Sequence, residues 1–322
     1  MMSDDQASCV VVGGGGVVGR RVVQRLRATL GEARVRAFDT RLDDLATSPR
    51  LDRAVVAVLA HPVPHHRDAL TLLDRGISVV SVSDMIDDVA LLLGEHRRAE
   101  FDASTLVVGA GMSSGLTALL ARHLADSMAT VDEIHISIHG TAGPACARQH
   151  HRALSGRAAF VHDSGFDSAR AGGGRELCWF PEPVGAYDCY RAEIPSALVL
   201  HHVFPEATRI SARMSANRRD RLTSRLPMLT PPHREGGVGA VRVEVRGTDH
   251  DGGRWTQISG MAEMVGTAAA ACASAYAERI VRGTSPRGLV VPGDREDDTG
   301  SLLRAVERFG VRLQEFTGVP SV

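Results

Sequence analysis

The chain of 322 residues contains no lysine, because all 37 residues of its lysine and arginine total are arginine. Lysine is the side chain that forms Schiff bases with carbonyl substrates, and it serves as a general base when its pKa is lowered. Its absence excludes both kinds of lysine chemistry.

Cysteine is scarce, and its spacing excludes two further kinds of site. The five cysteines are Cys9, Cys146, Cys178, Cys189 and Cys272. Their number is odd and no two are spaced as C-x-x-C, which argues against a disulfide framework and against a zinc ribbon. We expect buried thiols.

Strong net charge and long apolar runs are also missing. The formal net charge is −1 and the pI is about 6.9, so no basic surface indicates a nucleic-acid partner. No apolar run approaches the roughly 20 residues that cross a bilayer, and residues 1–7 are acidic and polar, unlike a signal sequence. We expect no nucleic acid and no membrane, but a small-molecule partner and a cytoplasmic location.

A glycine-rich turn lies between an apolar run, residues 9–12, and a predicted helix with apolar residues at every fourth position. Gly14, Gly16 and Gly19 have the G-x-G-x-x-G spacing. In that motif the first glycine permits a tight turn, the second lets a pyrophosphate approach, and the third lets helix and strand pack closely. The pattern predicts a dinucleotide site; the alternative is a doubly wound fold whose loop binds nothing.

The second predicted strand, residues 33–38, carries conflicting signals about the cofactor. It ends in Asp39, which lies about 20 residues beyond Gly19, where an acceptor for the ribose hydroxyl belongs. Arg41 follows two residues later and is suited to a 2′-phosphate. Asp39 favours NAD and Arg41 favours NADP, so the sequence leaves both open.

Further predicted strands at residues 53–59, 77–82 and 105–108 alternate with helices, which predicts a Rossmann-type doubly wound parallel sheet. The loops after these strands meet at the carboxyl edge of such a sheet. We predict cofactor contacts at Gly14, Gly15, Gly16, Val17, Val18, Asp39, Thr40, Arg41, Ala60, His61, Pro62, Ser83, Asp84, Gly109 and Met112. The histidines of this region have no ligand partner at an obvious spacing, so we expect no metal.

The pattern changes to alternating strands at residues 131–139, 209–214 and 241–246. Alternation predicts an inserted α+β domain with a largely antiparallel, open-faced sheet. We divide the chain into a dinucleotide-binding domain (1–127), an inserted substrate and dimerisation domain (128–262) and a helical return that packs on the first domain (263–322). A homodimer through the inserted sheet is expected.

The order of the motifs resembles the saccharopine dehydrogenase-like reductase family. The pieces that carry the resemblance are the glycine turn and residues 79–84, 109–116, 143–145, 190–191, 260–263, 267–268 and 286–288. The resemblance implies an NAD(P)-dependent oxidoreductase that acts on a C–N bond of an amino-acid-derived substrate, by imine reduction or secondary amine oxidation. The inserted domain is short and lacks the motifs that would identify saccharopine itself.

Two histidines, His150 and His151, follow the Gly143–Pro144 turn and can exchange a proton near neutral pH. Tyr190 is an alternative proton donor. The competing interpretation is an exposed pair on a helix face, beside Arg148 and Arg152.

For substrate carboxylates we consider Arg191 and Arg213 on predicted strands, together with His139, because the arginine fork binds both carboxylate oxygens. The competing interpretation is that such arginines are solvated or paired with acids, for example Glu193 or Glu244.

Two other functions remain open at this point. One is a nucleotide-binding scaffold or redox sensor without turnover, since no sharply defined catalytic group emerges. The other is a hydroxy-acid dehydrogenase, because the fold does not fix the reaction.

Overall fold

The computed structural model describes residues 8–40, 44–95 and 103–316. Its first sheet has six parallel strands in the order β14-β5-β4-β3-β1-β2. They are β1 (Ser8–Val12), β2 (Val35–Phe38), β3 (Ala54–Leu59), β4 (Ser78–Ser81), β5 (Thr105–Val107) and β14 (Gly288–Val290). The sheet grows in opposite directions from the boundary between β1 and β3, where such folds bind ligands.

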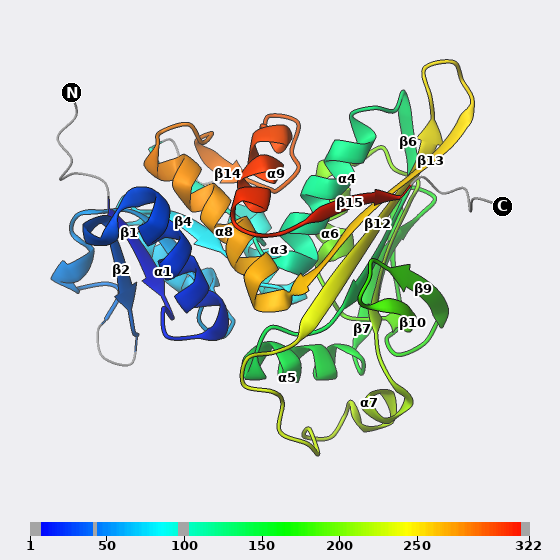
Figure 1. The fold of residues 1–322 in the computed structure, drawn as a ribbon, viewed down its shortest axis with the longest axis horizontal. Coiled ribbons are helices and arrows are strands. Elements are labelled where there is room, and N and C mark those ends of the chain that lie inside the picture. Colours follow the sequence, from blue (N-terminus) through cyan, green and yellow to red (C-terminus); the bar gives the residue numbers. More distant parts are fainter. Residues whose placement is uncertain (1–7, 41–43, 96–102, 317–322) are drawn as a thin grey trace.

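Helices cover this sheet on both faces (Figure 1). The helices α1 (Val17–Leu30) and α8 (Val265–Val281) pack against each other on one face. The helices α2 (His66–Leu73) and α3 (Ile86–Gly94) pack against each other, and α2 also packs on β4. Alanines occupy much of α8 and are buried, so this helix approaches the strands closely.

The second sheet has nine strands, in the order β15-β13-β12-β6-β11-β10-β9, with β7 pairing β11 and β8. They are β6 (Thr130–His139), β7 (Arg157–His162), β8 (Gly165–Arg170), β9 (Glu176–Phe180), β10 (Gly185–Arg191), β11 (Arg209–Ser215), β12 (Val238–Thr248), β13 (Arg254–Met264) and β15 (Leu313–Phe316). The β6–β11 pair is parallel and the other described pairs are antiparallel. The predicted fold class is confirmed: a doubly wound parallel sheet and a largely antiparallel second sheet.

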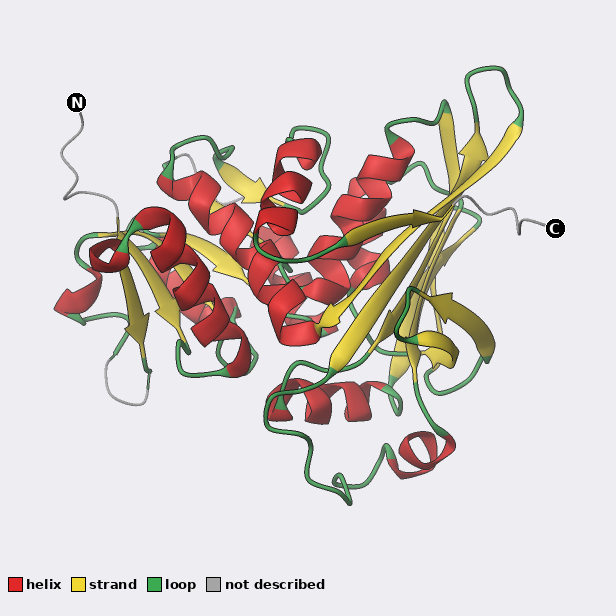
Figure 2. Ribbon diagram, in the orientation of Figure 1, coloured by secondary structure: helices red, strands yellow, loops and turns green. Residues whose placement is uncertain are grey.

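The helices α4 (Thr117–Ala125) and α6 (Ser196–Val203) pack on the second sheet. The helix α5 (Pro144–Ala153) lies beyond the ends of the long strands (Figure 2). The remaining helices are α7 (Arg218–Thr223) and α9 (Thr299–Arg308), and α9 packs against α4 and α8.

The last segment of the chain contributes a strand to each of the two sheets as well as helices. After α8 the chain adds β14 to the first sheet and β15 to the second. One continuous set of buried apolar side chains runs through both parts. Within the described ranges, no helix is both long and apolar enough to cross a membrane.

Candidate functional site

Close contacts explain the glycines that follow β1. Gly13 has a φ of 79°, a left-handed conformation that favours glycine. A Cβ at Gly14 would lie 2.6 Å from the Cβ of Ala37, and a Cβ at Gly19 would overlap the carbonyl oxygen of Gly13. The tight turn that we assigned to Gly14 is therefore made by Gly13, while Gly14 lets β2 approach.

The backbone N–H groups of the first turn of α1 have no partner within the helix. Its N-cap residue is Gly16, no side chain caps it, and no acidic residue lies in the first turn. Unpaired N–H groups and the positive end of the helix dipole together favour a phosphate or another anion.

These residues open onto a cavity of about 820 Å³ at the carboxyl edge of the first sheet. Its walls come from the loops after β1, β3, β4 and β5 and from α5. The predicted cofactor residues that line it are Gly15, Gly16, Val17, Val18, Ala60, His61, Pro62, Asp84 and Met112. The structure thus brings together the loops that the sequence assigned to one cofactor.

Five other predicted cofactor residues do not line the cavity: Gly14, Asp39, Thr40, Ser83 and Gly109. Asp39 nevertheless lies at the end of β2 beside the turn, because the Gly13 N–H donates to the carbonyl of Phe38 at 2.9 Å. Gly109 has a φ of 71° and shapes the loop after β5. Arg41 lies outside the described residues.

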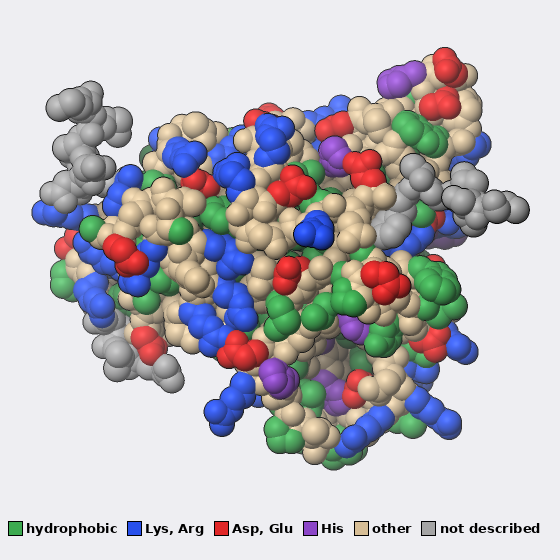
Figure 3. All heavy atoms as spheres, viewed as in Figure 1, with side chains coloured by type: hydrophobic (Ala, Val, Ile, Leu, Met, Phe, Trp, Pro, Cys, Tyr) green, Lys and Arg blue, Asp and Glu red, His purple; other side chains and the backbone are tan. Residues whose placement is uncertain are grey.

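The opposite wall of the cavity, which includes α5 and Glu235, contacts α1. The start of α5 lies against the start of α1, since a Cβ at Gly143 would lie 2.7 Å from Cγ2 of Val17. The Glu235 carboxylate forms ion pairs with Arg20 and, at 3.4 Å, with Arg21. Figure 3 shows basic side chains gathered over α1 beside this boundary.

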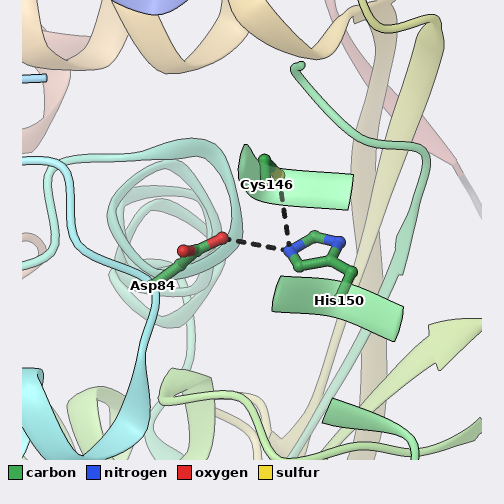
Figure 4. Close-up of side chains that lie close together, drawn as sticks. All are labelled: Asp84, Cys146 and His150. Carbon is green, nitrogen blue, oxygen red and sulfur yellow. Dashed lines mark hydrogen bonds and ion pairs between the residues drawn. The ribbon is translucent and has the colours of Figure 1, made fainter. Parts of the chain in front are cut away.

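A polar cluster stands inside the cavity where the loop after β4 faces α5. Nε2 of His150 lies 3.0 Å from Oδ2 of Asp84 and 3.8 Å from Sγ of Cys146. Cys146 and His150 are four residues apart, so they share one face of α5. Figure 4 shows the three side chains pointing toward one another.

Charge in this cluster decides the protonation of His150, which is 4% exposed. Burial lowers the pKa of its imidazole, but the neighbouring Cys146 and the Asp84 carboxylate outweigh burial and raise the pKa well above its usual value. The raised pKa favours the protonated imidazole, which can donate a proton.

A second histidine in the lining, His65, is neutral because it is fully buried. Nδ1 accepts a hydrogen bond from the Ser81 hydroxyl at 2.9 Å, and Nε2–H donates to the carbonyl of His61 at 2.9 Å. Burial, followed by the charge of His61, lowers the pKa of His65 to about 4. Its backbone N–H donates to the buried carboxylate of Asp88, which fixes the start of α2.

The other predicted catalytic residues lie elsewhere. His151 is buried and its Nε2–H donates to the carbonyl of Thr223 at 2.9 Å. Tyr190 is 4% exposed and lies under the guanidinium of Arg221, 3.9 Å from the ring centre. Of the proton donors that we predicted, the structure places only His150 in the cavity lining.

The predicted substrate residues also lie outside this cavity. Arg191 lies over the ring of Phe160, and Arg213 pairs with Glu176 at 3.0 Å. His139 lines a second cavity of about 710 Å³, which it shares with His151 and His150. His150 is therefore a common wall of the two cavities.

Sequence reasoning missed the arginines that do line the first cavity: Arg20, Arg148, Arg152 and Arg234. Within the part of the chain that the structure describes, the guanidinium groups of Arg148, Arg152 and Arg234 have no hydrogen-bond or ion-pair partner. Reasoning from the sequence also treated Cys146 as a buried thiol. Its spacing from His150 on a predicted helix was the available signal.

Fold and site together define a Rossmann-type α/β protein with an inserted sheet and a lined cavity between the two parts. The apo saccharopine dehydrogenase (L-Glu forming) of Saccharomyces cerevisiae has a similar structure, with a TM-score of 0.68, 13% identity and 97% of this chain and 99% of that chain covered. An amine dehydrogenase from Mycobacterium smegmatis is similar at a TM-score of 0.47, with 12% identity over 90% of this chain and 95% of that chain.

At these identities the likeness concerns the fold, and the second similarity is too weak to carry an argument. No protein-family model matches the chain, and no curated protein sequence matches it. The suspected resemblance to saccharopine dehydrogenase-like proteins is confirmed as a resemblance of fold.

Proposed function

We propose that the protein is an NAD(P)-dependent oxidoreductase that acts on a C–N bond of an amino-acid-derived substrate. The observation that carries the proposal is the shared cavity: the uncapped start of α1 and three further strand-end loops form one wall, and the proton-donating His150 stands on the other. The fold shared with a saccharopine dehydrogenase supports the same class of reaction.

The residues present fit a dinucleotide. Gly16 lies at the N-terminus of α1 and lines the cavity, so its missing side chain leaves room for a phosphate beside free N–H groups. A bound nicotinamide supplies or accepts the hydride. The loops after β3 and β5 form the neighbouring part of the same wall.

His150 is the proton donor that we propose for this site. Its ring is held by Asp84, and its raised pKa favours the protonated form, which can protonate a developing amine or stabilise negative charge on the substrate. Hydride transfer to an iminium carbon needs little further acid-base help, because the carbon is already activated.

We propose that the unpaired arginines of α5, Arg148 and Arg152, hold a substrate carboxylate. Both are exposed at the cavity wall, on the same helix as His150. A planar guanidinium binds both oxygens of a carboxylate. Arg191 and Arg213 have other neighbours and do not enter this assignment.

Titration with NADH and NADPH tests the cofactor site. We expect tight binding of one of them, and loss of that binding in Gly16→Val, because the branched side chain would fill the space at the start of α1. Gly94→Val is the matched control, since a Cβ there meets no atom within 4 Å and Gly94 lies outside the cavity. Binding of neither nucleotide by the wild-type protein would refute the proposal.

The reaction is tested with a panel of amino acids, each combined with aldehydes or oxo acids. Oxidation or reduction of the cofactor is followed at the nicotinamide absorbance band. Turnover of hydroxy acids alone would replace the C–N assignment by the hydroxy-acid alternative. Cofactor binding without turnover of either class would favour a scaffold or sensor.

A further inference from the structure

Three potential metal ligands converge on one point in the cavity. Oδ2 of Asp84, Sγ of Cys146 and Nε2 of His150 all lie within 4.8 Å of one another. They come from two separate parts of the chain, the loop after β4 and one face of α5 (Figure 4).

The arrangement differs from that of a catalytic triad. In a triad the carboxylate and the nucleophile engage opposite nitrogens of the imidazole. Here both Asp84 and Cys146 face Nε2 of His150, whereas its buried Nδ1 has no hydrogen-bond partner among the described residues. One proton on Nε2 cannot satisfy two acceptors equally well, but a cation between the three groups contacts all of them.

The distances fit a zinc ion. With bond lengths of about 2.0–2.3 Å, a tetrahedral zinc places a nitrogen and an oxygen ligand about 3.4 Å apart and a sulfur and a nitrogen about 3.6 Å apart. The corresponding distances here are 3.0 Å and 3.8 Å. Side-chain shifts of a few tenths of an ångström, about the scale of ordinary thermal displacement, bring the groups to ligand geometry.

We propose that Asp84, Cys146 and His150 bind a Zn²⁺ ion whose fourth coordination position opens into the cavity. A thiolate with an imidazole selects zinc over magnesium or calcium, which prefer oxygen ligands. Three protein ligands with an open position are typical of catalytic zinc, where a water or a substrate atom completes the site. A substrate nitrogen or oxygen held there would be polarised beside the cofactor loops.

The zinc site goes beyond the proposed function, although the two share a cavity. The ion takes the position of the proton on Nε2, so proton donation by His150 describes the metal-free protein and coordination describes the loaded one.

Metal binding is measured directly on the whole chain. The protein is first freed of metal with a chelator and then titrated with Zn²⁺ by equilibrium dialysis, and with Co²⁺ as a spectroscopic probe. We expect one ion per chain and, with Co²⁺, a thiolate-to-metal charge-transfer band and the visible bands of a tetrahedral site.

Each ligand variant, Cys146→Ala, His150→Gln and Asp84→Ala, is expected to weaken zinc binding by about 100-fold or more, beyond the roughly 10–100-fold cost of losing an outer partner. Cys178→Ala and His123→Gln, which alter residues outside the cavity, serve as controls and are expected to bind as the wild type does.

Failure to bind one equivalent overturns the inference, as does a Co²⁺ spectrum without a thiolate band or binding that survives Cys146→Ala. The Co²⁺ spectrum of the wild type needs no variant, so a misfolded mutant cannot hide the result. NADH and NADPH titrations of the metal-free protein separate the two proposals. Nucleotide binding without zinc binding rejects only the zinc site, and zinc binding without nucleotide binding rejects only the proposed function.

Discussion

At the scale of single residues, burial of His65 links stability to pH. The folded protein protonates this ring only near its lowered pKa of about 4, whereas the unfolded chain does so near about 6.5. Between these values the unfolded state binds more protons, so stability is full above about pH 6.5 and falls as the pH falls.

We therefore expect His65 to contribute a loss of about 3 kcal/mol in the free energy of unfolding between pH 6.5 and pH 4. Urea unfolding at pH 7, 5.5 and 4 measures it. His65→Asn should lose this part of the pH dependence, while His250→Asn, at an exposed turn, should keep it. If the free energy of unfolding depends on pH equally in the wild type and in His65→Asn, His65 is not the source of this pH dependence.

Arg148 provides a second test at this scale. Removing a charge-assisted hydrogen bond costs about 1.5–3 kcal/mol, so Arg148→Ala should raise the KM for a carboxylate substrate about 10-fold or more and leave the cofactor Kd unchanged. Arg191→Ala is the control, because Arg191 packs on Phe160 outside the cavity. If KM rises for Arg191→Ala and not for Arg148→Ala, the carboxylate is held by Arg191, as we expected from the sequence.

The spacing of glycines and apolar residues predicted the glycine turn and the helix after it, because both structures depend on residues that are close in sequence. The sequence pointed to Arg191 and not to Arg148, because which arginines line the cavity depends on the position of α5. The pairing of Asp84 with His150, which are 66 residues apart, likewise depends on how the two parts of the chain pack.

At the scale of elements, close backbone approach controls the turn between β5 and α4. A Cβ at Gly115 would lie 2.8 Å from the carbonyl oxygen of Gly109 and 2.9 Å from Sγ of Cys272 on α8. Gly115→Ala should therefore destabilise the protein by about 1–3 kcal/mol through overpacking. Denaturant unfolding of Gly115→Ala and of the control Gly94→Ala measures the two changes in the free energy of unfolding, since a Cβ at Gly94 meets no atom within 4 Å. A neutral Gly115→Ala would show that α8 can move away.

Strands with one buried face were predictable from the alternation of apolar and polar residues along the sequence. In β6 the buried Ile134, Ile136 and Ile138 alternate with polar residues, as the sequence indicated. In contrast, β8 is exposed or half-exposed along its whole length and reads GFDSAR, so it has no apolar period to detect. It pairs with β7 because a short turn joins the two strands and because β7 is itself part of the second sheet.

At the scale of the whole molecule, the edge of the second sheet offers a surface for a second copy. The edge strand β9 exposes Leu177 (58%) and Trp179 (66%), and Tyr187 on β10 is 45% exposed. Exposed apolar side chains on an edge strand favour association. We propose a homodimer through this edge.

Sedimentation at micromolar concentration should give a dimer for the wild type and a monomer for Trp179→Asp, because a charge there opposes burial of the edge. Trp255→Asp, on β13, should remain dimeric. A monomeric wild type would reject the dimer and leave the cavity assignments unaffected.

We propose that this cavity transfers hydride to a carbon that bears nitrogen. The most direct test supplies nicotinamide cofactor deuterated on its reactive carbon together with the amino-acid and carbonyl panel, and analyses the products by mass spectrometry. We predict one deuterium on the carbon attached to nitrogen, and none with Gly16→Val. Deuterium found only on a hydroxyl-bearing carbon, or in no product although the nucleotide binds, would contradict the claim.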